Sequence, residues 1–98
     1  MAYAVVFSRA VRAQIQGLPG YIKSVAKARM VQLSTNPRPP YSRELAGRPG
    51  FYRMWLDGRY RLVWHVSDDD QVVEVEYVGP KTPDLYAWLG LDRPDSEP

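Results

Sequence analysis

Three short runs of alternating apolar and polar residues, separated by tight turns, constrain the fold of this 98-residue chain more than any other feature. Residues 51–56, 60–66 and 72–78 are rich in aromatic and β-branched side chains, which is typical of strands. Asp57-Gly58 is a strong hairpin turn between the first two runs, and the acidic residues 67–71 form the next turn. Because links this short join only antiparallel neighbours, the sequence predicts a three-stranded antiparallel sheet.

The segment before these runs is predicted to form a strand and a helix. Residues 3–7 are β-branched and aromatic, which favours a strand. Ser8 is a good N-cap for a helix, and the apolar stripe of that helix is Val11, Ile15 and Leu18. Pro19-Gly20 ends this first helix.

A second helix follows at once, so the two helices are expected to pack as a hairpin. Its apolar face is predicted to carry Ile22, Val25, Ala26, Met30 and Leu33. Residues 36–40 contain three prolines, which cannot continue a helix. A loop then leads to Gly50, with a short strand or turn around residues 43–46.

The last predicted element is a short helix near the C-terminus. Thr82-Pro83-Asp84 is a good helix start, and Gly90 is a good stop. The predicted order is therefore β-α-α-β-β-β-α, an α+β fold in which a curved antiparallel sheet packs on an N-terminal helical hairpin. Residues 1–91 are expected to form one domain, and residues 92–98 a polar, disordered tail.

Alternation assigns the side chains of the sheet to two faces. The face towards the helices is predicted to carry Tyr52, Met54, Leu62, Trp64 and Val66. The other face, expected to be open to water, is predicted to carry Arg53, Trp55, Arg61, Val63 and His65. Arginine can bind a phosphate with two parallel hydrogen bonds, and an indole can stack on a base. The alternative is an ordinary solvated sheet face.

Composition restricts the classes of function. The chain has no cysteine, which excludes disulfides, thiolate metal sites and cysteine nucleophiles. No leader or membrane-spanning run is evident, so the protein is expected in the cytoplasm. Residues 1–65 hold 11 Lys and Arg against two acids, whereas residues 66–98 hold two against nine. This asymmetry favours a phosphate-rich or acidic partner for the basic part.

Several strings, in this order and spacing, resemble the RelE/ParE superfamily of bacterial toxins. They are residues 3–8, Asn36-Pro37, residues 44–47, residues 52–54, residues 58–64, Val78-Gly79 and Tyr86. The resemblance implies a type II toxin whose RelE branch cleaves messenger RNA at the ribosome and whose ParE branch poisons DNA gyrase. It also implies a cognate antitoxin that wraps the toxin, and operator DNA bound only through that complex.

The RelE-like chemistry implied by the resemblance needs no metal or cofactor: a 2′-hydroxyl attacks the adjacent phosphate. Arg53 falls where the family has a lysine, and Trp55 falls where a second lysine is expected. Arg61 matches an arginine that would stabilise the phosphorane. Lys81 falls where an arginine is expected, and Tyr86 matches a tyrosine that would move a proton or stack.

Other candidates belong to the same predicted site. Because an arginine side chain is not a base, His65 is the candidate proton acceptor. Trp55, Arg43, Arg48 and Arg59 are candidates for RNA binding. Alternatively, Tyr86 only packs its helix and Lys81 is only a loop lysine.

Three functions remain open at this point: a RelE-like endoribonuclease, a ParE-like gyrase inhibitor, and a decayed toxin that only binds antitoxin. The acidic tail residues Asp92, Asp95 and Glu97 are an alternative shield of the basic face in cis.

Overall fold

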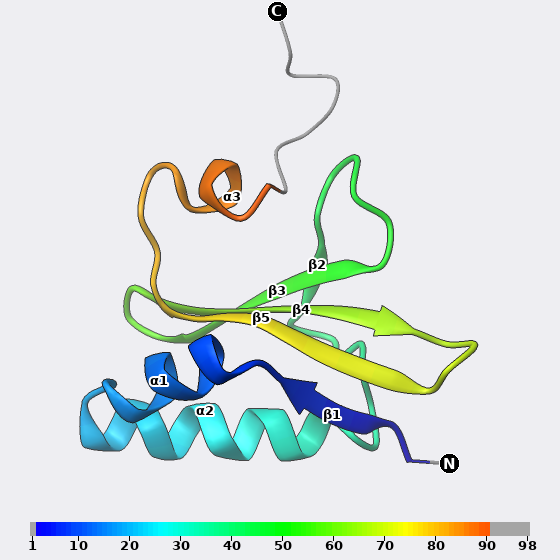
Figure 1. Ribbon diagram of the computed structural model, residues 1–98, viewed down its shortest axis with the longest axis horizontal. Helices are drawn as coiled ribbons and strands as arrows, with labels where there is room; N and C mark the ends of the chain where they lie inside the picture. Colours follow the sequence, from blue (N-terminus) through cyan, green and yellow to red (C-terminus); the bar gives the residue numbers. More distant parts are fainter. Residues whose placement is uncertain (1, 91–98) are drawn as a thin grey trace, which may run out of the picture.

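The computed structural model describes residues 2–90 as a five-stranded sheet with helices on both faces (Figure 1). In chain order the elements are β1 (Ala4–Phe7), α1 (Arg9–Gln16), α2 (Gly20–Leu33), β2 (Arg43–Glu44), β3 (Phe51–Asp57), β4 (Tyr60–Ser67), β5 (Val72–Pro80) and α3 (Leu85–Trp88). The predicted α+β fold and the short strand near residue 43 are confirmed. The predicted tail, residues 92–98, lies outside the described residues.

The strands lie in the order β1-β5-β4-β3-β2. The predicted antiparallel pairing of β3, β4 and β5 is confirmed, and β2 adds antiparallel to β3. β1 pairs with β5 in parallel, so the sheet is mixed rather than wholly antiparallel. No short link restricts this pair, because the helical hairpin and three strands separate β1 from β5 in the chain.

The helical hairpin covers one face of the sheet, as predicted (Figure 1). The Ser8 hydroxyl accepts a hydrogen bond from the Val11 N–H at 3.1 Å and caps α1. All the predicted apolar residues of the two helices are buried except Val25, which is partly buried against the same core. The sheet side of this core carries Met54, Leu62, Trp64 and Val66, with Tyr52 partly buried beside them.

The proline-rich loop is fixed to the core by the indole of Trp64. Its Nε1–H donates to the carbonyl oxygen of Pro37 at 2.9 Å, and both residues are buried. A buried indole N–H needs such a partner. This hydrogen bond therefore fixes the path of the chain between α2 and β2.

Two predictions are wrong: the start of the C-terminal helix and the openness of the second face of the sheet. α3 begins at Leu85 rather than at Pro83, because the Thr82 hydroxyl donates to the Asp84 carboxylate at 3.2 Å and does not cap the helix. The second face of the sheet is not fully open to water, because α3 lies over it and Val63 beneath is buried (Figure 1). Within residues 2–90, no helix is long and apolar enough to cross a membrane.

Candidate nucleic-acid interface

The outer face is the face of the sheet that points away from α1 and α2. A small second core made of Val63, Tyr77 and Leu85 fixes α3 on it. The Tyr77 hydroxyl donates to the Pro80 carbonyl at 2.7 Å. Only glycine fits at position 79, because an added Cβ would lie 2.8 Å from that hydroxyl oxygen. This packing sets the position of Tyr86, the next residue after Leu85.

Arg61 lies on β4 beneath α3 and is only 5% exposed. Its Cζ atom lies 3.7 Å from the centre of the Trp55 ring, the cross-strand neighbour on β3. Its Nη1–H donates to the Tyr86 hydroxyl oxygen at 2.5 Å. Arg61 Nε is buried and has no hydrogen-bond partner within residues 2–90. A buried donor without an acceptor is unfavourable, and an oxyanion is the group that would satisfy it.

Lys81 completes what we term the cation–aromatic cluster, which consists of Trp55, Arg61, Lys81 and Tyr86. The Lys81 Nζ atom lies 5.5 Å from the centre of the Tyr86 ring, and the Arg61 Cζ atom lies 6.0 Å from it. Lys81 Nζ also donates to the Thr82 carbonyl at 2.8 Å, which holds the side chain near the start of α3. The cationic side chains of Arg61 and Lys81 therefore both lie beside the ring of Tyr86. The structure brings these four predicted residues together.

The other predicted arginines lie around the cluster. Arg53 is half-buried on the outer face, opposite Val63, and pairs across β2 and β3 with Arg43, which is exposed. Arg59 is exposed in the β3–β4 turn, and Arg48 is half-buried in the loop before β3. The cationic side chains therefore extend from Arg61 towards the β2 edge of the sheet.

His65 lies apart from Arg61. The two are four residues apart on β4, which is about 13 Å along an extended strand, and the buried Val63 stands between them. The His65 ring instead packs against Phe51, with 4.6 Å between ring centres. The structure therefore does not bring the candidate proton acceptor to the candidate phosphate-binding group.

Comparison with known structures identifies the fold. The chain superposes on a free double-arginine mutant of the E. coli toxin RelE with a TM-score of 0.74 and 26% identity, covering 98% of both chains. It matches the toxin in the intact E. coli RelBE toxin–antitoxin complex with a TM-score of 0.72 and 29% identity, covering 83% of this chain and 99% of that one. A YoeB/ParE toxin from Agrobacterium tumefaciens shares the fold at 15% identity, with a TM-score of 0.68 over 81% of this chain and 99% of that one.

The chain is a member of the RelE/ParE superfamily of toxins. The recognition rests on three-dimensional structure. No family model and no curated protein sequence matches the chain.

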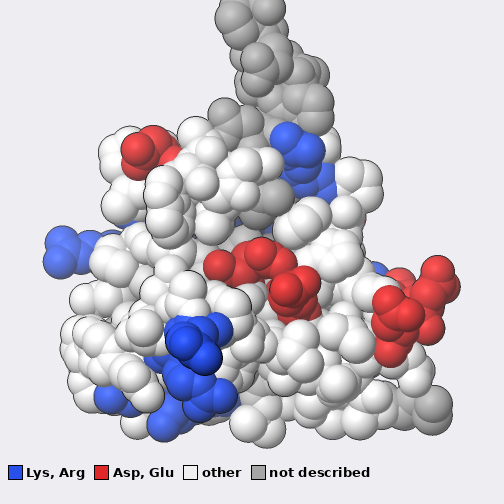
Figure 2. All heavy atoms as spheres, in the orientation of Figure 1, with Lys and Arg blue, Asp and Glu red and all other residues white. Residues whose placement is uncertain are grey.

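Two acids on the outer face of this RelE/ParE toxin were not singled out from the sequence. Glu74 pairs with His65 across β4 and β5, and Glu76 lies at a β-bulge in the same strand pair. Burial and Glu74 raise the pKa of Glu76, while His65 acts in the opposite direction. Figure 2 shows acidic side chains over β5, below α3. The alternation of valine and glutamate over residues 72–76 was the signal available. Phosphate groups are therefore favoured on the β3 side of the outer face and disfavoured over β5.

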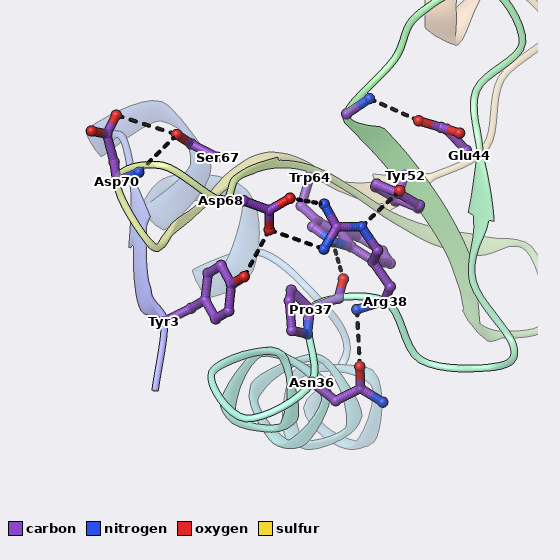
Figure 3. Close-up of polar contacts among 11 residues, drawn as sticks. Tyr3, Asn36, Pro37, Arg38, Glu44, Tyr52, Trp64, Ser67, Asp68 and Asp70 are labelled. Carbon is purple, nitrogen blue, oxygen red and sulfur yellow. Dashed lines mark hydrogen bonds and ion pairs between the residues drawn. The ribbon is translucent and has the colours of Figure 1, made fainter. Parts of the chain in front are cut away.

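Sequence reasoning also missed the structural use of Arg38. Its guanidinium binds both carboxylate oxygens of Asp68, at 3.1 and 2.8 Å, and its Nε–H donates to the Tyr52 hydroxyl at 2.8 Å (Figure 3). The Tyr3 hydroxyl donates to the same carboxylate at 2.7 Å. This network joins the proline-rich loop, the β4–β5 turn and the N-terminus of the toxin. Arg38 therefore serves the fold and is not available for a nucleic acid.

Proposed function

We propose that this toxin is an endoribonuclease of a type II toxin–antitoxin module that cleaves messenger RNA at the ribosome. The observation that carries the proposal is the buried Arg61 guanidinium. Within residues 2–90 it has no carboxylate partner, and its Nε has no hydrogen-bond acceptor. A buried cation is normally paired, so this side chain is suited to an anion supplied by a ligand. The likeness to RelE structures at 26–29% identity supports RNA as the source of that anion.

The cluster suits the attack of a 2′-hydroxyl oxygen on the adjacent phosphorus atom. In this step the O2′–P bond forms, the P–O5′ bond breaks, and a 2′,3′-cyclic phosphate remains. Arg61 and Lys81 would stabilise the additional negative charge of the phosphorane. Tyr86 would donate its hydroxyl proton to the leaving O5′, since Arg61 already occupies its oxygen as donor.

The proton of the 2′-hydroxyl is assigned to water or to a group of the ribosome. The cluster itself contains no imidazole or carboxylate, and His65 lies beyond Val63. The proposed step therefore gives His65 no role, and Arg53 and Arg43 would bind flanking phosphates instead.

Access to Arg61 requires one aromatic ring to move. The Trp55 ring lies over the guanidinium and is itself 50% exposed. A cation–π contact at such a site is worth about 0.5–2 kcal/mol, which a charge-assisted phosphate contact can replace. Trp55 would then stack on a neighbouring base, a sequence-tolerant contact worth about 1–3 kcal/mol.

We further propose a cognate antitoxin as the partner of this toxin. The E. coli RelBE structure is a toxin–antitoxin complex, and this chain covers 99% of the toxin in it. Operator DNA is expected to be bound only through such a complex.

The test is a short induction of the toxin in bacteria with mapping of new RNA 5′ ends, beside the Arg61→Ala variant. New ends inside reading frames, at a fixed codon phase and absent in the variant, would support the proposal. Growth arrest without new ends would instead support a gyrase inhibitor, which the replacement of a lysine by Trp55 favours. No arrest with a folded protein would indicate a decayed toxin.

A further inference from the structure

A row of three side chains crosses the outer face at some distance from the cation–aromatic cluster. Phe51 of β3 pairs with His65 of β4, and His65 pairs in turn with Glu74 of β5. The Phe51 and His65 ring centres lie 4.6 Å apart, and both side chains are half-buried. Gly50 packs on the same imidazole, since a Cβ added there would lie 3.1 Å from His65 Nε2. These contacts fix a small aromatic platform on the sheet.

Two carboxylates lie beside this platform without a cationic partner. Glu74 is exposed and Glu76 is half-buried, and within residues 2–90 neither forms an ion pair. Burial and the charge of Glu74 raise the pKa of Glu76, so the two acids destabilise each other's charged form. A ligand that donates hydrogen bonds to these oxygens would relieve this effect.

The ligand that fits such a site is a flat ring with hydrogen-bond donors along one edge. An ionised carboxylate accepts hydrogen bonds and donates none. The Watson–Crick edge of guanine carries two adjacent donors, N1–H and N2–H, which match the two oxygens of one carboxylate. Uracil has a single N–H between two carbonyl oxygens, which a carboxylate repels. Proteins read single-stranded RNA in this way, by stacking on bases and by hydrogen bonds to that edge.

The distance from Arg61 places this site beyond the cleaved bond. His65 lies four residues from Arg61, which is about 13 Å along an extended strand. Stacked nucleotides rise about 3.4 Å each, so the base concerned lies a few nucleotides from the reacting phosphate. Cations such as Arg53 hold phosphates on the β3 side, and the acids over β5 repel them (Figure 2). The β5 side is therefore left to the bases.

We propose that Phe51 and Glu74 form a guanine-binding subsite, in which Phe51 stacks on the base and the Glu74 carboxylate accepts hydrogen bonds from N1–H and N2–H. This inference rests on the proposed function, because the subsite reads the RNA that is cleaved at the cation–aromatic cluster. His65 supports the Phe51 ring and makes no base-specific hydrogen bond. The subsite gives the toxin a preference for a guanosine a few nucleotides from the cleaved bond.

The test measures binding by fluorescence anisotropy with the full-length protein. The probes are oligouridines of about eight nucleotides that carry guanosine, adenosine or uridine at one central position. All nucleotides are 2′-O-methylated, which prevents cleavage. The guanosine probe should bind at least about fivefold more tightly than the uridine probe, the lower end of what one bidentate base contact gives.

The variant that tests the contact is Glu74→Gln. An amide offers one acceptor and one donor where guanine requires two acceptors, so the ratio of the uridine Kd to the guanosine Kd should fall to about one. The matched control is Asp69→Asn, which makes the same change of charge at an exposed position of the β4–β5 turn. This control should keep the preference of the wild type.

Four outcomes would overturn the inference: equal Kd values for guanosine and uridine, tighter binding of adenosine, a preference that survives Glu74→Gln, or one that Asp69→Asn also abolishes. The measurement involves no RNA cleavage. A protein that prefers guanosine through Glu74 but cleaves no RNA would refute the proposed enzyme and leave the subsite intact. Cleavage by a protein without this preference would do the reverse.

Discussion

At the scale of single residues, Arg61 is the group on which the proposed chemistry depends. Arg61→Ala is expected to lower cleavage by about 10²–10³-fold, the usual effect of removing one donor to a developing oxyanion. The free energy of unfolding should change little or rise, because the substitution also removes a buried Nε without an acceptor. Cleavage assays and urea unfolding check both parts. Arg9→Ala, at an exposed position of α1 on the helical side of the sheet, is the control and should leave both unchanged.

Tyr86 is proposed to act through its hydroxyl rather than only through its ring. Tyr86→Phe keeps the packing of the ring against Lys81 and Arg61 but removes the proton donor. Cleavage should fall by about 10²-fold, with RNA binding unchanged in a filter-binding assay. Unchanged cleavage would show that Tyr86 only packs, the alternative that its sequence context left open.

His65→Gln tests the separation seen along β4. Because His65 lies four residues from Arg61 along β4, with the buried Val63 between them, cleavage by this variant should remain within about twofold of the wild type, well short of the 10²-fold typical of a lost general base. A large loss that depends on pH in kinetic assays would mean that the RNA brings His65 to the reacting phosphate.

Strand alternation was sufficient to assign Arg61, Trp55 and His65 to one face, because the side-chain period of a strand is local. It could not reveal that Arg61 is buried, since this depends on α3, a helix of four residues brought over the sheet from a distant part of the chain. The separation of His65 from Arg61 has a different cause, the four-residue spacing along β4, which is about 13 Å in an extended strand and is already present in the sequence.

At the scale of elements, Leu85 is the buried side chain of α3, with Tyr86 and Leu89 packed beside it in the small second core. Leu85→Ala is expected to lower the free energy of unfolding by about 2–3 kcal/mol, because Leu85 is 1% exposed in a core of few residues. Cleavage should fall as well, since Tyr86 loses its position. Denaturant unfolding and circular dichroism should show the helical hairpin retained. Ala87→Ser, at an exposed position of α3, should change neither quantity appreciably.

The helical hairpin and the β3–β4–β5 meander could be predicted because short links and clear periods define them. The parallel pairing of β1 with β5 could not, since long-range pairing leaves no local pattern. The start of α3 was wrong because Thr82 binds Asp84 instead of a helix N–H. The first error concerns a long-range pairing, and the second a local side-chain hydrogen bond, two residues apart, that competes with the helix cap.

At the scale of the whole molecule, the Arg38–Asp68 network joins distant segments of the chain. Arg38 and Tyr3 lower the pKa of Asp68 in the folded protein. Its stabilising contribution is therefore present above the pKa of an unfolded aspartate and is lost as the pH falls through the lowered folded value. Asp68→Asn should lower the Tm at neutral pH, and the difference from wild type should shrink on acidification. A Tm difference that is independent of pH would contradict this role. Asp69→Asn, in the same turn, is the control.

The outer face as a whole separates cations near β3 from acids on β5, which suits a single-stranded RNA that follows one side of the sheet. The most direct test is cleavage of a defined messenger RNA on purified bacterial ribosomes, with a matched RNA carrying a 2′-deoxynucleotide at the cleaved position. We predict 2′,3′-cyclic phosphate and 5′-hydroxyl ends with the wild-type protein, and no cleavage with the deoxy substrate or with Arg61→Ala. Cleavage that persists without the 2′-hydroxyl or without Arg61 would contradict the account, as would growth arrest by a protein that leaves the RNA intact.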